Sequence, residues 1–165
     1  MLNIYGDIIG SEKDHRWRIE HAQVLSQRDI SKFGEYNIIP SIQPTHATSD
    51  MYWAGQRLGK MREKNGYIFK MLLEQNQKVA LGTDFPVEAV SPFYTFHSAV
   101  YRQDAKGFPA GGYQMENALS REQTLRGMTI WSAYGNFEEN FISKLKFCFY
   151  FMLHIFNSIF IINCY

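Results

Sequence analysis

Short apolar runs alternate along the chain with stretches in which apolar residues recur three or four positions apart. The short runs predict buried strands, and the helical spacing predicts amphipathic helices beside them. The expected strands are 17–19, 37–43 and 79–81, and the expected helices lie within 26–36, 67–76, 93–101 and 120–131. Helices that follow strands in this way are typical of βαβ units with a parallel sheet. The pattern therefore predicts the α/β class.

Two of the expected helices carry capping signals at their starts. Ser26 with Asp29, and Ser120 with Gln123, place a hydroxyl three residues before an acid or an amide, as in a capping box. Pro40 falls inside the second expected strand, where its lack of an N–H group is awkward for a central position. The sequence thus predicts defined starts for two helices and an irregularity in one strand.

Length and charge narrow the class further. With 165 residues the chain can bury a core, but it is shorter than the roughly 250 residues typical of a complete (β/α)8 barrel. The 17 basic and 16 acidic residues give a formal net charge of +1 without a basic stripe, so nucleic-acid binding is not expected. The two cysteines, Cys148 and Cys164, are both near the end, which fits a reducing compartment, and a cytoplasmic location is expected.

The composition changes near the end of the chain. Residues 1–140 mix charged, glycine and apolar positions and are expected to form one globular unit, whereas 141–165 are aromatic and apolar. Three interpretations of this tail stay open: a membrane segment at 147–162, a buried terminal helix or strand, or sequence read out of frame. The membrane interpretation would place His154 in the hydrocarbon interior, where a polar side chain is costly.

Three polar side chains stand where the expected strands end. His21 follows the first strand, His46 the second and Asp84 the third. In parallel α/β sheets, ligands and catalytic groups gather at the carboxyl ends of the strands. Imidazole and carboxylate are zinc ligands, and a zinc site with an open position activates water near neutral pH. A carboxylate beside that water can take its proton and return it to a leaving amine, a role that Asp84 would fill.

Each of these residues also has an ordinary structural explanation. His21 could be a hydrogen-bonded histidine at a strand edge, His46 could cap a helix, and Asp84 could be a turn residue. The separations, 25 residues from position 21 to 46 and 38 from 46 to 84, match no compact ligand motif. From the residues alone, both explanations stay open.

Longer segments around these positions resemble the amidohydrolase superfamily. Within it, they are most similar to the branch of N-substituted formamide deformylases. The similar segments are 15–23 (His-Arg-Trp-Arg-Ile-Glu-His-Ala-Gln), 43–50 (Gln-Pro-Thr-His-Ala-Thr-Ser-Asp), 82–87 (Gly-Thr-Asp-Phe-Pro-Val), 91–92, 101–103, 119–126 and 133–139. They occur in the same order over about residues 1–139, so the resemblance is specific.

The resemblance implies the latter part of a (β/α)8 TIM barrel, roughly strands 5–8 with their helices. It makes His21 and His46 metal ligands from the fifth and sixth strands, and Asp84 a metal ligand and proton shuttle from the eighth. The implied reaction is hydrolysis of carbon–nitrogen bonds other than peptide bonds, in amides or formamides, by metal-activated water. The implied cofactor is a divalent metal such as zinc, and the implied partner is a small amide-type substrate.

The sequence also departs from the family pattern. The His-x-His pair expected from the first strand and the bridging Lys or Glu from the fourth are not recognisable in the chain, which makes the ligand set incomplete. Two alternatives to an active hydrolase follow: a catalytically inactive truncated fragment, and a membrane-tethered remnant. Expressed alone, the chain is expected to bind zinc weakly and to show no amide hydrolysis.

Overall fold

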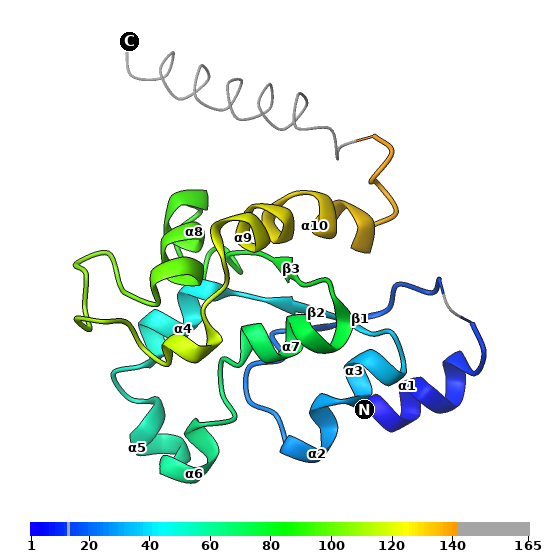
Figure 1. Ribbon diagram of the computed structural model, residues 1–165, viewed down its shortest axis with the longest axis horizontal. Coiled ribbons are helices and arrows are strands. Elements are labelled where there is room, and N and C mark those ends of the chain that lie inside the picture. The colour runs from blue at the N-terminus through cyan, green and yellow to red at the C-terminus, as the bar shows by residue number, and fades with distance from the viewer. Residues whose placement is uncertain (13, 142–165) are drawn as a thin grey trace.

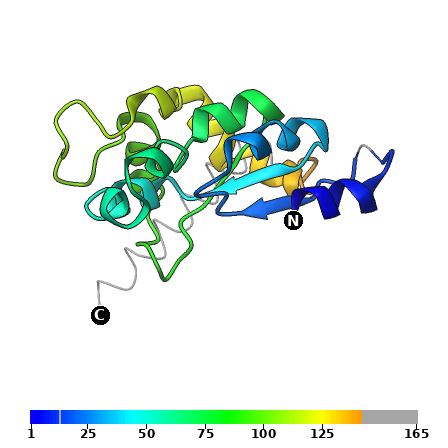
Figure 2. The same ribbon diagram turned by 90° about the horizontal axis from the view of Figure 1, so that it is seen from below.

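Three short strands form one parallel sheet in the computed structural model of the chain, which describes residues 1–12 and 14–141 (Figure 1). The strands are β1 (Arg18–Glu20), β2 (Ile39–Ile42) and β3 (Ala80–Leu81), and they lie side by side in that order. Because all three strands run the same way, their carboxyl ends meet at one edge of the sheet. Figure 2 shows this common direction in the arrows of β1 and β2.

Helices connect the strands and pack against them. They are α1 (Leu2–Ile9), α2 (Gln27–Ile30), α3 (Lys32–Glu35), α4 (Pro44–Asp50), α5 (Ala54–Leu58), α6 (Lys60–Glu63), α7 (Phe69–Asn76), α8 (Pro92–Tyr101), α9 (Arg121–Met128) and α10 (Ile130–Gly135), with a 3₁₀ helix η1 at Met115–Asn117. The predicted alternation of strands and helices, and with it the α/β class, is confirmed.

The core lies between one face of the sheet and helices α3 and α7, which Figure 2 shows together on one side of β1 and β2. Ile38 and Ile42 are fully buried and share an apolar cluster with Phe33 of α3. Because side chains alternate along a strand, Ser41, its register partner Glu20 and Arg18 belong to the opposite face. There Ser41 is half-buried and Arg18 is exposed. One face of the sheet is therefore covered, whereas the other is covered only in part: Ile39 is buried there near Gly135 of α10, and Arg18 is exposed.

Pro40 lies inside the central strand, at the position that the sequence marks as awkward. Ile39 donates its N–H to Trp17 O at 2.9 Å, so the next residue directs its nitrogen away from β1 and toward the β3 side. Pairing with β3 begins only at Ser41, one residue after the proline. Because no ladder bond is required at position 40, the missing N–H group costs nothing there.

Helix α9 approaches β3 closely at a glycine. A Cβ atom on Gly127 would lie 2.6 Å from Leu81 Cγ and 3.1 Å from Val79 O. Only a residue without a side chain lets the helix axis come this near to the strand. The start of α9 is also as predicted, since Ser120 accepts the Gln123 N–H and the Gln123 side chain accepts the Ser120 N–H in a full capping box.

The predicted helix at 26–36 is instead two single turns, α2 and α3, which are separated at Ser31. Its predicted cap is also wrong, because the Ser26 side chain makes no capping hydrogen bond. A Cβ atom on Gly34 of α3 would lie 2.5 Å from Gln75 O of α7. We attribute the break to this close contact with α7, which directs the second turn independently of the first.

The predicted helix at 120–131 ends earlier than expected, at Met128, and α10 begins after a one-residue break. Thr129 Oγ1 donates to Leu125 O at 2.6 Å, and Ser132 Oγ donates to Gly127 O at 2.6 Å. These hydroxyls satisfy carbonyl groups that continued helix would have used, so they stabilise the interruption.

Two further features differ from the sequence-based expectations. No bounds were predicted for helices α1, α4, α5 and α6, because none has both a capping signal and a long apolar spacing. The resemblance implies a strand between those that carry His46 and Asp84, whereas β2 pairs directly with β3.

The predicted tail at 141–165, with its proposed membrane segment at 147–162, lies outside the described residues except for its first residue. Within the part of the chain that the structure describes, no helix is long and apolar enough to cross a membrane.

Candidate metal centre

The three residues singled out at the strand ends meet at one point. His21 directly follows β1, His46 lies in the first turn of α4 after β2, and Asp84 lies in the turn after β3. Because the strands are parallel and adjacent, chain segments that are far apart in the sequence leave the sheet together. The sheet therefore places two imidazoles and a carboxylate beside one another.

The distances between these three side chains are compatible with the binding of one metal ion. His21 Nε2 lies 4.0 Å from Asp84 Oδ2, and His46 Nε2 lies 3.9 Å from the same oxygen. The two imidazole rings are nearly parallel, with 5.7 Å between their centroids and 13° between their planes. One ligand atom from each residue falls within 4.8 Å of the other two. The three side chains thus surround a single small volume.

The imidazole of His46 is the most enclosed of the three side chains. It is 10% exposed, against 46% for His21 and 37% for Asp84. Its Nε2 atom is buried and has no hydrogen-bond partner. An unpaired buried nitrogen is costly unless some group fills the vacant bond, so the site is built to receive a partner for this atom.

Other buried polar atoms without a hydrogen-bond partner concentrate in residues 43–46, the tetrapeptide that ends with His46. Among the described residues, four buried side-chain atoms lack a hydrogen-bond partner, and three of them belong to Gln43, Thr45 and His46. These residues lie where β2 passes into α4, at the carboxyl edge of the sheet. Unsatisfied polar groups are rare in native cores, so their concentration here makes this edge of the sheet a candidate functional position.

A divalent cation fits this arrangement with little adjustment. Zinc lies about 2.0–2.2 Å from nitrogen and oxygen ligands, which puts tetrahedral ligands roughly 3.5 Å apart. The two distances from Asp84 Oδ2, 3.9 Å to His46 and 4.0 Å to His21, exceed that separation only slightly. Rotation of the exposed His21 and Asp84 side chains would close the gap. His21, His46 and Asp84 are therefore the residues that could hold a metal.

The backbone at the site is held in an unusual conformation. His21, Ala22 and Asp84 all have positive φ values, of 66°, 42° and 57°. Non-glycine residues in this left-handed region cost about 1–3 kcal/mol each, and they persist only where surrounding contacts enforce them. Such outliers gather at functional sites, and here they aim two of the three candidate ligands.

The remaining described histidines lie elsewhere. His15 Nε2 donates to Tyr36 O at 2.9 Å, while its Nδ1 accepts the Trp17 N–H at 3.0 Å. His97 of α8 contacts Gln103 O and stacks obliquely on Tyr101. Both imidazoles have protein partners, which fits structural roles, and neither belongs to the metal cluster.

Arg102 is a central residue that the sequence did not single out by its chemistry. It is fully buried at the end of α8, and its Nε donates to Tyr113 O at 2.8 Å. Its guanidinium also lies 4.8 Å from the centroid of Phe69. Burial lowers the pKa of Arg102 to about 10, so the group is still charged at neutral pH. Because it anchors the loop after α8 to α7, its role is structural.

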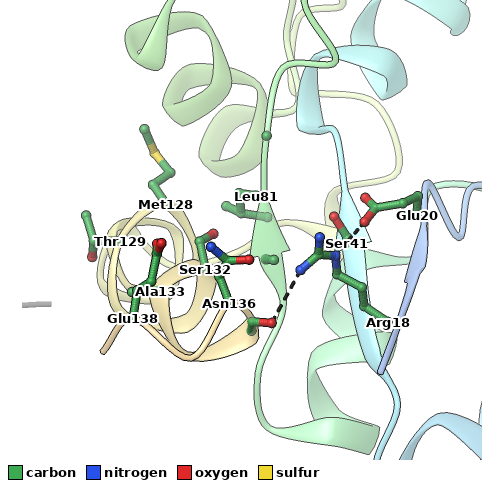
Figure 3. A pocket seen from close by; sticks show the side chains of 13 residues that line it. Arg18, Glu20, Ser41, Leu81, Met128, Thr129, Ser132, Ala133, Asn136 and Glu138 are labelled. Carbon is green, nitrogen blue, oxygen red and sulfur yellow. Dashed lines mark hydrogen bonds and ion pairs between the residues drawn. The ribbon is translucent and has the colours of Figure 1, made fainter. Parts of the chain in front are cut away.

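A cavity of about 420 Å³ lies on the open side of the sheet, between the strands and α10 (Figure 3). Figure 3 shows Arg18 reaching toward α10, where its Nη1 donates to Gly135 O at 3.3 Å. Ser41 and Asn136 also line the cavity, but none of the three candidate metal ligands does. The cavity therefore lies on the open side of the sheet, and the three candidate metal ligands are not among the residues that line it.

Comparison of the sequence with known proteins finds a matching family and similar proteins. Residues 9–141 match the sequence model of the amidohydrolase family. Protein LONG AFTER FAR-RED 3 of Arabidopsis thaliana is 32% identical over 149 residues, which are 88% of this chain and 25% of that protein. The putative amidohydrolase YtcJ of Bacillus subtilis is 32% identical over 116 residues, which are 70% of this chain and 22% of that protein.

Solved structures give the same result. An uncharacterized metal-dependent hydrolase from Pyrococcus horikoshii is similar with a TM-score of 0.71 and 29% identity, over 87% of this chain and 29% of that one. Its counterpart from Pyrococcus furiosus is similar with a TM-score of 0.68 and 28% identity, over 87% of this chain and 28% of that one. The chain spans about a quarter of the length of these relatives. Its sequence and its fold together show that it belongs to the amidohydrolase family.

Proposed function

We propose that this chain carries part of the metal centre of a hydrolase that cleaves carbon–nitrogen bonds other than peptide bonds, with zinc as the metal. Amides or formamides are the proposed substrates, following the resemblance to N-substituted formamide deformylases. The observation that carries the proposal is the convergence of His21, His46 and Asp84 from three adjacent parallel strands onto one volume. The unpaired Nε2 of His46 inside that volume supports a metal rather than an ordinary structural role.

Each of the three residues has a distinct part in the proposed chemistry. A zinc ion held here would lower the pKa of a coordinated water to about 7. His46 and His21 would supply the nitrogen ligands, with their Nε2 atoms 3.9 and 4.0 Å from Asp84 Oδ2. Since Oδ2 faces both imidazoles, the other carboxylate oxygen, Oδ1, is the atom proposed to take a proton from the attacking water. The same oxygen would then deliver that proton to the leaving nitrogen.

The open face of the sheet supports the assignment to a (β/α)8 barrel. Parallel sheets are normally covered on both faces, whereas Arg18 and Glu20 are exposed on this one. In a barrel, this face would line the interior, and β1, β2 and β3 would be consecutive strands because each pairs with the next. The relatives are roughly three to three and a half times as long as this chain, a length that can include the remaining strands of a barrel.

A second candidate function follows from the small share of the relatives' length that the chain spans. The chain spans 22–29% of the relatives that it matches, and it supplies three candidate ligands. A catalytically inactive member of the family that retains part of the metal site is therefore the alternative proposal.

The two candidates are separated by measuring metal binding and turnover on the same purified chain. Metal-free protein is titrated with zinc by calorimetry and then assayed with N-substituted formamides. Hydrolysis that appears with zinc and is lost in Asp84→Ala would establish the hydrolase. Zinc binding that requires His46 but brings no turnover would establish the inactive alternative. No zinc binding by a folded chain would refute the metal centre itself.

A further inference from the structure

Helix α4 carries a second functional position one turn after its candidate ligand. Asp50 follows His46 by four residues, so both side chains lie on the same side of the helix. Asp50 Oδ2 accepts the Gln23 Nε2–H at 2.6 Å and the Tyr67 Oη–H at 2.8 Å. Gln23 Nε2 also donates to Tyr67 Oη at 3.1 Å, which closes a triangle of three hydrogen bonds.

This triangle reaches the segment that carries the other histidine. Gln23 lies two residues after His21, at the exit of β1. Its carbonyl oxygen accepts the Tyr67 N–H at 2.8 Å, and Leu25 donates its N–H to Asn65 O at 3.1 Å. The chain after His21 is therefore bound to residues 65–67 through its backbone and to α4 through the Gln23 side chain.

The backbone between His21 and Gln23 requires such support. His21 and Ala22 hold consecutive positive φ values, a conformation that is strained for residues with a side chain. A flexible segment would relax into an ordinary conformation and carry the His21 imidazole away from His46. The contacts that begin at Gln23 lie directly where the strained pair ends.

We propose that Asp50 is a positioning residue for the metal centre. Together with Tyr67 it fixes Gln23 against α4, and it thereby sets the position of His21 relative to His46. This inference rests on the proposed function, because it concerns the same metal. Charged hydrogen bonds of this kind are stronger than neutral ones, which suits a group that must oppose backbone strain.

A hydrogen bond from the preceding residue of α4 shows, by comparison, why Asp50 is proposed as the positioning residue. Ser49 Oγ donates to Glu88 Oε1 at 2.6 Å, which connects α4 to the loop that carries Asp84. Ser49 is exposed and Glu88 is half-buried, and the bond itself lies at the surface, so water competes for it. Asp50 is half-buried, and its partner Tyr67 is only 2% exposed. The Asp50 link is therefore the one expected to control the geometry of the site.

The first test uses the full chain and zinc titration by calorimetry. Asp50→Ala is expected to weaken zinc binding by about 10–100-fold, as loss of a group that orients a metal ligand does. Asp50→Asn keeps an acceptor oxygen and is expected to fall between Asp50→Ala and the wild type. The matched control is Asp104→Ala, which also removes a carboxylate that accepts a tyrosine hydroxyl, here that of Tyr52. Asp104→Ala is expected to leave the zinc affinity unchanged.

The second test is made without metal, by hydrogen exchange. The Ala22 N–H, which donates to Glu20 O at 2.9 Å, and the Tyr67 N–H are expected to exchange faster in Asp50→Ala, while the Thr124 N–H in α9 keeps its rate. Tyr67→Phe serves the same purpose if Asp50→Ala fails to fold. Unchanged zinc affinity and unchanged exchange in a folded variant would overturn the proposal. If the wild type binds no zinc, the proposed function fails, and the exchange rates alone still decide whether Asp50 positions His21.

Discussion

The imidazoles of His21 and His46 lie face to face, 13° from parallel, although 25 residues separate them in the sequence. His21 directly follows β1 and His46 lies in the first turn of α4, so the pairing of the parallel strands brings the two rings together. This pair, with Asp84 beside it, makes zinc-dependent stability the first property to test.

Zinc is expected to stabilise the chain. A ligand that binds only the folded state at 100 times its dissociation constant raises the free energy of unfolding by about 2.7 kcal/mol. The thermal midpoint should therefore rise with zinc and return to its starting value with a chelator. His46→Ala should abolish the rise, whereas His97→Gln, which removes a histidine outside the cluster, should retain it. An equal rise in both variants would place the zinc elsewhere.

The two serines that the sequence marks as helix caps should differ sharply. Ser120 forms a complete capping box with Gln123, so Ser120→Ala is expected to lower the free energy of unfolding by about 1 kcal/mol. Ser26 makes no capping hydrogen bond, so Ser26→Ala is expected to change it by less than about 0.5 kcal/mol. Urea denaturation of both variants gives the comparison. Equal losses would show that the two helix starts are equivalent in solution.

The contact between α9 and β3 should not tolerate a methyl group. Gly127→Ala would force the new Cβ against Leu81, and overpacking of this kind costs about 1–3 kcal/mol. Gly82→Ala is the matched control, because a Cβ atom at position 82 meets nothing within 4 Å. Chemical denaturation should show a lower midpoint for the first variant and little change for the second. A stable Gly127→Ala would mean that α9 can move away from the sheet.

A buried tyrosine, Tyr67, and a half-buried one, Tyr113, should make the chain sensitive to alkali. Burial raises the pKa of Tyr67 and of Tyr113 above the ordinary value of 10.0, and nearby Asp50 and Glu63 raise them further. The folded state therefore holds these protons more tightly than the unfolded state does. Stability should be constant below pH 10 with respect to these groups and should fall as the pH rises above it.

Ultraviolet titration of tyrosinate checks this expectation. Tyr67 and Tyr113 should ionise only as the chain unfolds, and Tyr113→Phe should shift the alkaline unfolding to higher pH. Arg102 acts in the opposite direction, because burial lowers its folded pKa to about 10 from 12.5. Reversible ionisation of both tyrosines in folded protein would contradict the assignment of burial as the cause.

The parallel arrangement and the meeting of the strand ends were predictable from the sequence. Short apolar runs separated by helical spacing leave few topologies, and in a parallel sheet the residues after the strands must share an edge. That rule alone suffices to bring His21, His46 and Asp84 together at the same edge. The metal-binding role of the three residues stays a prediction.

The supporting contacts were not predictable in the same way. Gln23, Asp50 and Tyr67 meet because α4 turns its last residue toward the exit of β1, and no spacing in the sequence encodes that angle. Arg102 carries a charge and would ordinarily be assigned to the surface, yet it is fully buried. The helix breaks at Ser31 and Thr129 likewise depend on tertiary contacts and on local hydroxyl bonds rather than on periodicity.

The left-handed backbone at His21, Ala22 and Asp84 would set stability against the proposed metal binding. Glycine at position 22 would adopt the observed φ without strain, so the chain would gain folding free energy at that residue. The same change would free the segment that aims the imidazole of His21. Variants selected only for resistance to heat should therefore accumulate at these positions and lose affinity for zinc as they become more robust.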